Sequence, residues 1–455
     1  MSIGLIGIIV ALIVFLLLTY KGFSTFYVSA ICAVIVAVTN SMNPITAFTD
    51  SYVSGLVSII QSLFSIIFLG VLLGKLFTDT GAASSIANTL ISKFIKSGQS
   101  PEKRIKIGLL IVLIICGLCT MGGIDAYIQV FTLFPIVLII AEVCDIPRRF
   151  MPGMLVLNCA FVAAPGAPQI MNVLAVSSLQ QMGHNVSSVS GVVPGIVAVI
   201  IIGVGGYFTI LHMILKSRRN GESFELGDIP AVKAEDNRKL PPFIVAVLPL
   251  ITVFICYTII KLDITISLCS GILVTIVFMQ HYIIREQNGN KITGLTAIKN
   301  SLNFGAETYP NALILIATPA AFAAVIEATK AFEDLVQGLG GLNINMMMLA
   351  FITVAIIVLF TSSPPAAIMI ALPMISGIAA AKGLNLNMNL VLRIAVLTSI
   401  TFESLPWNGT IILMQNLSHT NHKQSYLPYF WQTVVWTTAA ALAAVLISAL
   451  FPNII

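Results

Sequence analysis

Charged side chains are scarce in this sequence. Asp, Glu, Lys and Arg together make up 9% of the 455 residues, whereas soluble domains carry roughly 25%. Hydrophobic residues make up 58%, and the mean hydropathy is +1.00. Several successive apolar runs of ~20 residues are each long enough to cross ~30 Å of hydrocarbon. The composition excludes a soluble globular domain and predicts an all-α polytopic membrane protein.

Motifs for catalysis and for nucleotide binding are also lacking. No P-loop or other ATP-binding motif is present, so transport would draw on an ion gradient, on the membrane voltage or on neither. No set of His, Cys or acidic residues has metal-ligand spacing, and no nucleophile–base pair indicates an intramembrane enzyme. We therefore expect no enzymatic activity, no resident cofactor and no metal. The net charge of +5 lies in short loops, where it is expected to set topology and not to bind nucleic acid.

Two apolar runs are interrupted by proline and glycine. The stretch Ala163–Gln169 holds two prolines and a glycine, and the stretch Ser404–Thr410 holds Pro406 and Gly409. Proline lacks the N–H group that a helix needs, and glycine readily takes non-helical angles. Each run is therefore predicted to form two half-helices joined by an unwound link. Such a link survives at membrane depth only where protein or a wet cavity covers it, and broken helices of this kind build transporter sites.

A pair of short apolar runs precedes each broken helix. Ile107–Thr120 and Ile124–Val143 flank Gly122 and Gly123, whereas Met346–Phe360 and Ala366–Ala381 flank a Thr-Ser-Ser-Pro-Pro stretch. We expect each pair to form a re-entrant hairpin that enters and leaves the membrane on one side. The order of span, hairpin and proline-broken helix thus occurs twice. The predicted divisions are N-terminal transmembrane helices (1–50), a first repeat (51–215), a cytoplasmic linker (216–242), connecting transmembrane helices (243–308) and a second repeat (309–455).

The basic loops predict that the two repeats are inverted in the membrane. If Lys93–Arg104 is cytoplasmic, the other basic loops also fall inside, and two loops without Lys or Arg fall outside. Both termini then lie outside. The long span before the first hairpin runs out-to-in, whereas the corresponding span before the second runs in-to-out. Inverted repeats with discontinuous helices are a recurring plan of transporters.

The breaks predict a site for an anion. Each leaves a half-helix N-terminus with free N–H groups and the positive end of a dipole, and such ends bind anions without a full positive charge. Glycines there let a substrate approach the backbone, and hydroxyl and amide side chains offer hydrogen bonds. The alternative is that these small residues only let helices pack. The predicted substrate-binding residues are Gly122, Gly123, Pro165, Gly166, Gln169, Thr361, Ser362, Ser363, Asn408, Gly409 and Thr410.

Two acidic residues, Asp125 and Glu403, lie beside breaks. An ionisable group inside a membrane protein is a functional candidate, because low dielectric disfavours its charged form. Either carboxyl group could therefore bind and release a coupling proton in each cycle. The alternative is a carboxylate that caps a half-helix N-terminus or pairs with a base.

Other charged residues in the apolar runs have simpler interpretations. Arg393 lies near the external end of its span, where we expect it to extend to the headgroups; attraction of an anionic substrate is the alternative. Helical spacing predicts two ion pairs at the membrane interface, Lys75 with Asp79 and Glu327 with Lys330.

Three stretches carry a resemblance to a known family: Gly74–Ala83, the Asp145–Arg149 turn and Ala164–Asn172. In these residues, and in the order and spacing of nearly the whole chain, the sequence resembles the gluconate permease (GntP) family of the ion-transporter superfamily. The resemblance implies proton-linked uptake of small carboxylates such as gluconate, paired re-entrant hairpins and an elevator-like homodimer. In the sugar-acid branch a histidine precedes the Pro-Gly of the first broken helix, and here that position is Ala164. The chain looks more like a non-gluconate branch whose substrates are smaller acids such as hydroxybutyrate.

Together these features predict a secondary active transporter in a bacterial cytoplasmic (inner) membrane. We expect proton-coupled symport of a small organic carboxylate by an elevator-like alternating-access mechanism. One alternative is a sodium-coupled symporter, in which carbonyls of the breaks with Ser362 and Ser363 hold Na⁺. The other is a channel or a non-transporting membrane scaffold, which would not need two matched breaks.

Overall fold

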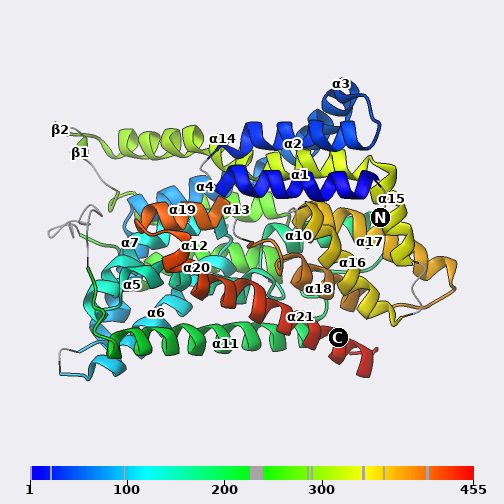
Figure 1. The fold of residues 1–455 in the computed structure, drawn as a ribbon. Helices are drawn as coiled ribbons and strands as arrows, with labels where there is room; N and C mark the ends of the chain where they lie inside the picture. Colours follow the sequence, from blue (N-terminus) through cyan, green and yellow to red (C-terminus); the bar gives the residue numbers. More distant parts are fainter. Residues whose placement is uncertain are drawn as a thin grey trace.

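A computed structural model of the chain describes residues 3–20, 23–96, 98–124, 126–225, 239–283, 286–287, 290–340, 344–361, 364–405 and 409–454. Within these residues the fold is helical apart from one short antiparallel pair, β1 (Glu286–Gln287) with β2 (Asn290–Lys291). Figure 1 shows the helices running largely side by side along one common direction. The all-helical, polytopic fold that the composition predicts is confirmed.

The N-terminal part begins with a helical hairpin and ends with a bent helix. A left-handed glycine, Gly81 (φ +72°), separates the last two helices of this part, and their adjoining segments Phe64–Asp79 and Ala82–Phe94 meet at 54°. The elements are α1 (Ile3–Tyr20), α2 (Thr25–Thr39), α3 (Pro44–Thr46), the π-helical turn η1 (Ala47–Tyr52), α4 (Val53–Asp79) and α5 (Ala82–Phe94).

The next part contains the first predicted hairpin and the first broken helix. The chain leaves helical geometry after Val162 and resumes it at Ile170, as the Pro-Gly-x-Pro stretch predicts. The elements are α6 (Pro101–Met121), α7 (Ala126–Cys144), η2 (Arg148–Phe150), α8 (Met151–Leu155), η3 (Val156–Asn158), α9 (Cys159–Val162), α10 (Ile170–Gln181) and α11 (Val192–Arg219).

The remaining part repeats this order after two connecting helices. Helix α18 ends at Ser399 and helix α19 begins at Gly409, so the second break is present as well. The elements are α12 (Phe243–Phe254), η4 (Ile255–Ile259), α13 (Ile264–Met279), α14 (Gly294–Glu327), α15 (Lys330–Gly340), α16 (Met346–Thr361), α17 (Pro364–Ala381), α18 (Met388–Ser399), α19 (Gly409–Leu417), α20 (His422–Phe430), η5 (Trp431–Trp436) and α21 (Thr437–Leu450).

Helices at corresponding places in the two halves pack against each other. The helices that precede the hairpins, α4 and α14, are in extensive contact, and so are the closing helices α11 and α21. The second half of each broken helix packs on a hairpin arm from the other half of the chain: α10 on α17, and α19 on α7. This reciprocal arrangement agrees with two repeats. Their opposite orientation in the membrane and the division boundaries stay predictions.

The described residues contain helices that suit a membrane. Three of them, α6, α11 and the continuous stretch His422–Leu450, are long and apolar enough to span, and the bent α4–α5 pair adds a fourth candidate. Helix α6 is longer than the predicted hairpin arm, because Ser100 caps its N-terminus and Pro101 occupies its first position. Its length allows a full crossing, so the re-entrant character of the first hairpin stays a prediction.

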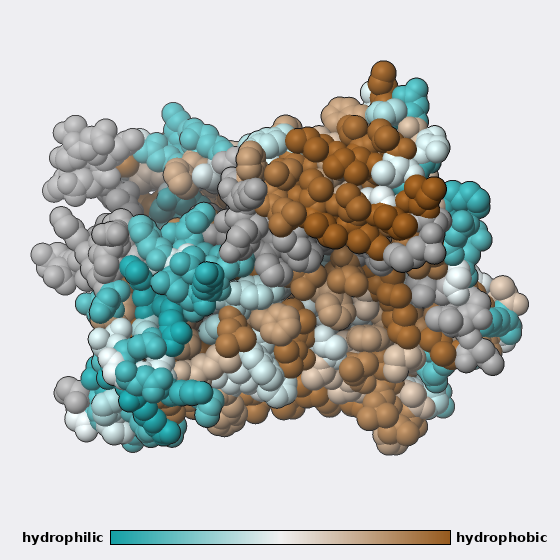
Figure 2. All heavy atoms as spheres, viewed as in Figure 1, coloured by the Kyte–Doolittle hydropathy of each residue, from teal (hydrophilic) through white to brown (hydrophobic). Residues whose placement is uncertain are grey.

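The surface separates into a hydrophilic end and an apolar flank. Hydrophilic residues gather at the left of Figure 2, where the α5–α6 connection carries exposed Lys93, Lys96 and Lys103. The apolar flank covers α1 and α2, whose outer side chains include exposed Ile6, Val10 and Ile31, among others. Figure 1 places both marked chain ends on the side opposite β1 and β2. This polarity agrees with basic loops on one side of a membrane and both termini on the other.

One of the two predicted ion pairs is confirmed. Lys75 Nζ lies 2.8 Å from Asp79 Oδ1, and Ser301 Oγ on α14 donates a 2.6 Å hydrogen bond to Asp79 Oδ2, which links α4 to α14. The pairing of Glu327 with Lys330 is wrong. Lys330 instead pairs with Asp334 at 2.9 Å, because α14 ends at Glu327 and the predicted spacing crosses the junction to α15.

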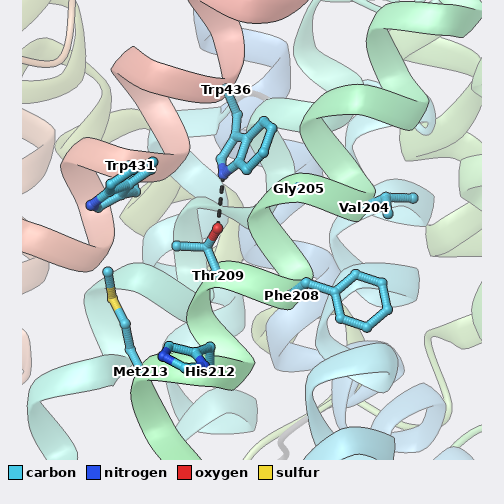
Figure 3. Close-up of a pocket in the computed structure, with 8 residues that line it drawn as sticks. All are labelled: Val204, Gly205, Phe208, Thr209, His212, Met213, Trp431 and Trp436. Atoms are coloured by element: carbon cyan, nitrogen blue, oxygen red, sulfur yellow. Dashed lines mark hydrogen bonds between the residues drawn. The ribbon is translucent and has the colours of Figure 1, made fainter. Parts of the chain in front are cut away.

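A glycine face of α11 allows close contact with η5 (Figure 3). A Cβ atom on Gly205 would lie 2.4 Å from the Trp436 ring, whose Nε1 donates a 2.9 Å hydrogen bond to Thr209 Oγ1. In a membrane the hydrophobic effect does not drive helices together, so helix association depends on close packing, which small residues allow. Next to this contact lies a groove of about 530 Å³, lined by Val204, Gly205, Phe208, Thr209, His212, Met213, Trp431 and Trp436.

We predict that Gly205→Ala destabilises the protein by ~1–3 kcal/mol, because a rigid indole held by a hydrogen bond cannot yield to the added methyl group. Gly377→Ala is the matched control, since Gly377 is also helical but has open space around its Cβ position. The control is expected to gain up to about 1 kcal/mol from helix propensity. Thermal unfolding of the detergent-purified variants measures both, and equal melting temperatures would contradict the prediction.

Candidate functional site

The first break is a compact turn centred on Gly166. Its backbone takes a left-handed conformation, with φ +78°, and its N–H donates a 2.9 Å hydrogen bond to Ser188 O. Thr258 Oγ1 donates to Gly166 O at 2.6 Å, and a Cβ atom on Gly166 would lie 2.7 Å from Thr258 Cγ2. Both the backbone angle and the close neighbour require glycine at this position.

Asn172 binds the carbonyl groups that the break releases. Its side chain is fully buried on the first turn of α10. Its Nδ2 donates to the carbonyl oxygens of Val162 (3.2 Å), Ala164 (3.2 Å) and Ala167 (3.1 Å). The Ala164 carbonyl also accepts a 3.1 Å hydrogen bond from the Ala167 N–H. A carbonyl without any partner in an apolar interior would be costly. One amide side chain thus holds both sides of the break together.

Arg393 also binds the first break, although it belongs to α18 in the other half of the chain. Its side chain is 0% exposed, so the expectation that it extends to the headgroups is wrong. Nη1 donates to Ala163 O (2.7 Å) and Asn172 Oδ1 (2.8 Å), Nη2 to Ser188 O (3.0 Å) and Ser190 O (2.8 Å), and Nε to Ser190 O (3.1 Å). The physical reason lies in the tertiary structure: four oxygens from a distant part of the chain converge there and match the planar fork of the guanidinium group.

The tip of the first predicted hairpin lies against the same break. Gln169, which is 3% exposed, donates from Nε2 to Thr120 O (2.8 Å) and Ile124 O (3.3 Å) at the α6–α7 turn. Gly123 in that turn has φ +80°, and a Cβ atom there would lie 3.5 Å from Pro168. The structure therefore brings together the predicted site residues Gly122, Gly123, Pro165, Gly166 and Gln169.

A buried polar cluster extends from this contact. Gln129 Nε2 on α7 donates to Thr120 Oγ1 (2.9 Å) and Ile124 O (2.8 Å), and Asn158 Nδ2 lies 3.5 Å from Gln129 Oε1. Sequence reasoning did not assign a role to Thr120, Gln129, Asn158 or Asn172. Each of these is an uncharged polar residue within an apolar run, which indicates a buried hydrogen bond but does not identify the partner.

The N-terminus of α10 opens from the break. Its capping position is Gln169, whose side chain is occupied by the hairpin tip and makes no capping hydrogen bond. The first N–H groups of a helix have no partner within the helix, and they carry the positive end of its dipole. This arrangement supplies the half-helix N-terminus that the sequence predicts for an anion site.

The structure describes the second break up to Leu405 and again from Gly409. Glu403 is half-buried there. The neighbouring Ser404 receives two long contacts from α20, with Tyr429 Oη 3.5 Å from its Oγ and Tyr426 Oη 3.4 Å from its carbonyl oxygen.

The other predicted site residues lie at helix ends or outside the described residues. Thr361 is the last residue of α16, and Gly409 and Thr410 are the first two of α19. These positions agree with the predicted break points. Four predicted residues lie outside the described residues: Asp125, Ser362, Ser363 and Asn408.

We predict that Gly166→Ala destabilises the protein more than Gly183→Ala does. Both glycines have positive φ, +78° and +84°, so each alanine costs about 1–2 kcal/mol in backbone strain. Only Gly166 has a close neighbour at its Cβ position, which adds ~1–3 kcal/mol, whereas the Cβ position of Gly183 is open. Thermal unfolding of the two variants tests this, and equal destabilisation would show that Thr258 does not constrain the turn.

We predict that Gln169→Leu weakens both the fold and transport. The change removes the amide that joins the break to the hairpin tip, at a cost of ~1–3 kcal/mol for the carbonyls left behind. Gln181→Leu at the exposed other end of α10 is the matched control. Melting temperature and uptake by reconstituted protein are the measurements. A Gln169→Leu variant that behaves like the control would argue against this contact as part of the site.

Comparisons with known proteins agree with this architecture. The model of the GntP family permeases matches residues 2–450. An uncharacterised transporter of Bacillus subtilis (strain 168), YxjC, is 24% identical over 494 residues, which cover 98% of this chain and 99% of that protein. The crystal structure of the Alcanivorax borkumensis YdaH transporter, described as having an unusual topology, superposes with a TM-score of 0.50 at 12% identity. That superposition covers 90% of this chain and 89% of the other, and it shows similarity of fold alone.

The family match spans nearly the whole chain, and the helices suit a membrane. The chain belongs to the GntP permease family and is a multi-pass membrane transporter rather than an enzyme.

Proposed function

We propose that this transporter carries a small organic carboxylate together with a proton. One observation carries the proposal: Arg393 brings a buried positive charge to the first break, next to the uncapped N-terminus of α10. Among the residues that the structure describes, the ion pairs do not include Arg393. The guanidinium charge and the N-terminal end of the α10 dipole are both positive, and both favour a bound anion. A carboxylate fits this field, and it matches the class of substrate that the family resemblance implies.

The break favours a small substrate. Ala164 and Ala167 are buried in the link, and the position that holds histidine in the sugar-acid branch is Ala164. Nearby side-chain donors such as Gln169 and Asn172 are already bound to backbone carbonyls. Recognition then falls to backbone N–H groups and to hydroxyl groups at the second break, which suits a short hydroxy acid such as hydroxybutyrate better than a sugar acid.

Glu403 is the residue to which we assign proton binding, with Asp125 as the second candidate. Glu403 is half-buried at the second break. A carboxyl group in such a place, when it is opened alternately to the two sides of the membrane, can take up a proton on one side and release it on the other. Protonation there would accompany arrival of the anionic substrate and reduce the net charge that crosses the membrane.

An elevator-like movement is compatible with the division of contacts. Helices α4 and α14 pack along each other, with the Asp79–Ser301 link at one end, and would form the fixed part. The hairpins and broken helices are interlocked, α10 with α17 and α19 with α7, and would move as one body. A homodimer in a bacterial cytoplasmic membrane would hold the fixed parts together. The basic loops on one side and the relative from Bacillus subtilis support that membrane.

Uptake by proteoliposomes tests the proposal. With hydroxybutyrate or gluconate outside, we expect accumulation that is driven by an inward proton gradient, abolished by a protonophore and unchanged when choline replaces Na⁺. Glu403→Gln is expected to abolish gradient-driven accumulation but to retain substrate counterflow, whereas Glu102→Gln at an exposed position is the control. Uptake that ignores the proton gradient would remove the proton from the mechanism, and accumulation that requires Na⁺ would favour the sodium alternative.

A further inference from the structure

We propose that Arg393 is a fixed cation at the first break, in the position that a dissociable coupling cation would otherwise occupy. This inference deepens the proposed function, on which it rests for the role of the break in transport. It concerns the choice of coupling ion: carbonyl groups at an unwound membrane helix can coordinate Na⁺, and here such groups are bound by a side chain of the chain itself.

The hydrogen bonds at the break leave few carbonyl groups for an ion. Arg393 binds the carbonyl oxygens of Ala163, Ser188 and Ser190. Asn172 binds those of Val162, Ala164 and Ala167, and Thr258 binds that of Gly166. All carbonyls from 162 to 167 except that of Pro165 therefore accept a side-chain hydrogen bond, and a Na⁺ ion would have to displace several of these donors to gain its ligands.

Two glycines of the surrounding backbone pack closely against the Arg393 side chain and fix its position. Gly191, at φ +63°, is so close to the arginine stem that a Cβ atom there would lie 2.6 Å from Arg393 Cβ. A Cβ atom on Gly195 would lie 3.2 Å from Arg393 Cδ and 2.4 Å from Pro165 Cγ. Two glycines of the same chain segment thus make room for the stem, and the five N–H donors of the side chain are all used. The cation cannot leave without disrupting this packing.

Two consequences follow for transport. The guanidinium charge stays at the first break in every conformation in which these hydrogen bonds persist. The anion site therefore remains positive without binding a cation from solution. Because Arg393 belongs to α18, it also ties the first break to the helix that leads into the second break. The coupling ion must then bind elsewhere, and the first break is not its site.

The test uses the full-length purified protein and needs no substrate. Melting temperatures are measured for the wild type, Arg393→Ala and the control Lys382→Ala, which removes an exposed cation. Each is measured in NaCl and in choline chloride at equal ionic strength, and with guanidinium ion added at low millimolar concentration. We expect the wild type and the control to respond to neither ion. Arg393→Ala is expected to melt at a lower temperature and to be partly restored by guanidinium, which refills the vacated position.

Three results would overturn the inference: an Arg393→Ala protein as stable as the wild type, guanidinium rescue that is equal in the control, or a saturable Na⁺ stabilisation of the wild type that Asn172→Leu removes. If Arg393→Ala cannot be purified, Arg393→Lys serves instead. The lysine ammonium group has three donors for the four oxygens, so Arg393→Lys is expected to fold but to melt at a lower temperature than the wild type. A melting temperature equal to that of the wild type would contradict the proposal. Failure of proton-driven uptake would overturn the proposed function without changing these melting temperatures, so the two failures are distinguishable.

Discussion

The structure depends on how the backbone groups of two helix breaks are satisfied within an apolar interior. A carbonyl or N–H group that has no hydrogen-bond partner in such surroundings costs several kcal/mol of folding free energy. At the first break the carbonyls are bound by Asn172, Thr258 and Arg393, which come from three separate parts of the chain. The break can exist only because α18 and the η4 turn are present beside it. Its local shape is therefore a property of the whole fold.

This solution also determines the electrostatic character of the site. The carbonyl groups, which would attract cations, are turned toward protein donors, whereas the N-terminus of α10 has no side-chain cap. A buried guanidinium group is normally expensive because it loses its hydration. Here its hydrogen bonds to four oxygens replace that hydration, while the net charge remains. The result is a buried positive field at the first break, which has the sign that the proposed carboxylate substrate requires.

Close packing makes these contacts possible. Gly195 lets Pro165 and the Arg393 stem approach α11, and Gly205 on the same helix accepts the Trp436 ring. Helix α11 therefore contacts the first break near its N-terminus and η5 of the second half near its middle. In an apolar solvent the association of helices relies on such fitted surfaces and on buried hydrogen bonds. A substitution on α11 far from the break is thus able to alter the geometry of the site.

The sequence by itself determined the membrane class, the helical content and the two places where proline and glycine interrupt a helix. Scarce charge, apolar runs and the placement of Pro165, Gly166 and Pro406 are local properties, and proline and glycine act on their own backbone whatever surrounds them. The ion pair of Lys75 with Asp79 could be predicted from the sequence for the same reason, because both residues lie on one helix. Only the tertiary structure decided the destination of Arg393, which reading its span alone had placed at the headgroups. The oxygens that hold it belong to residues 163, 172, 188 and 190, and no local pattern records that these converge on position 393.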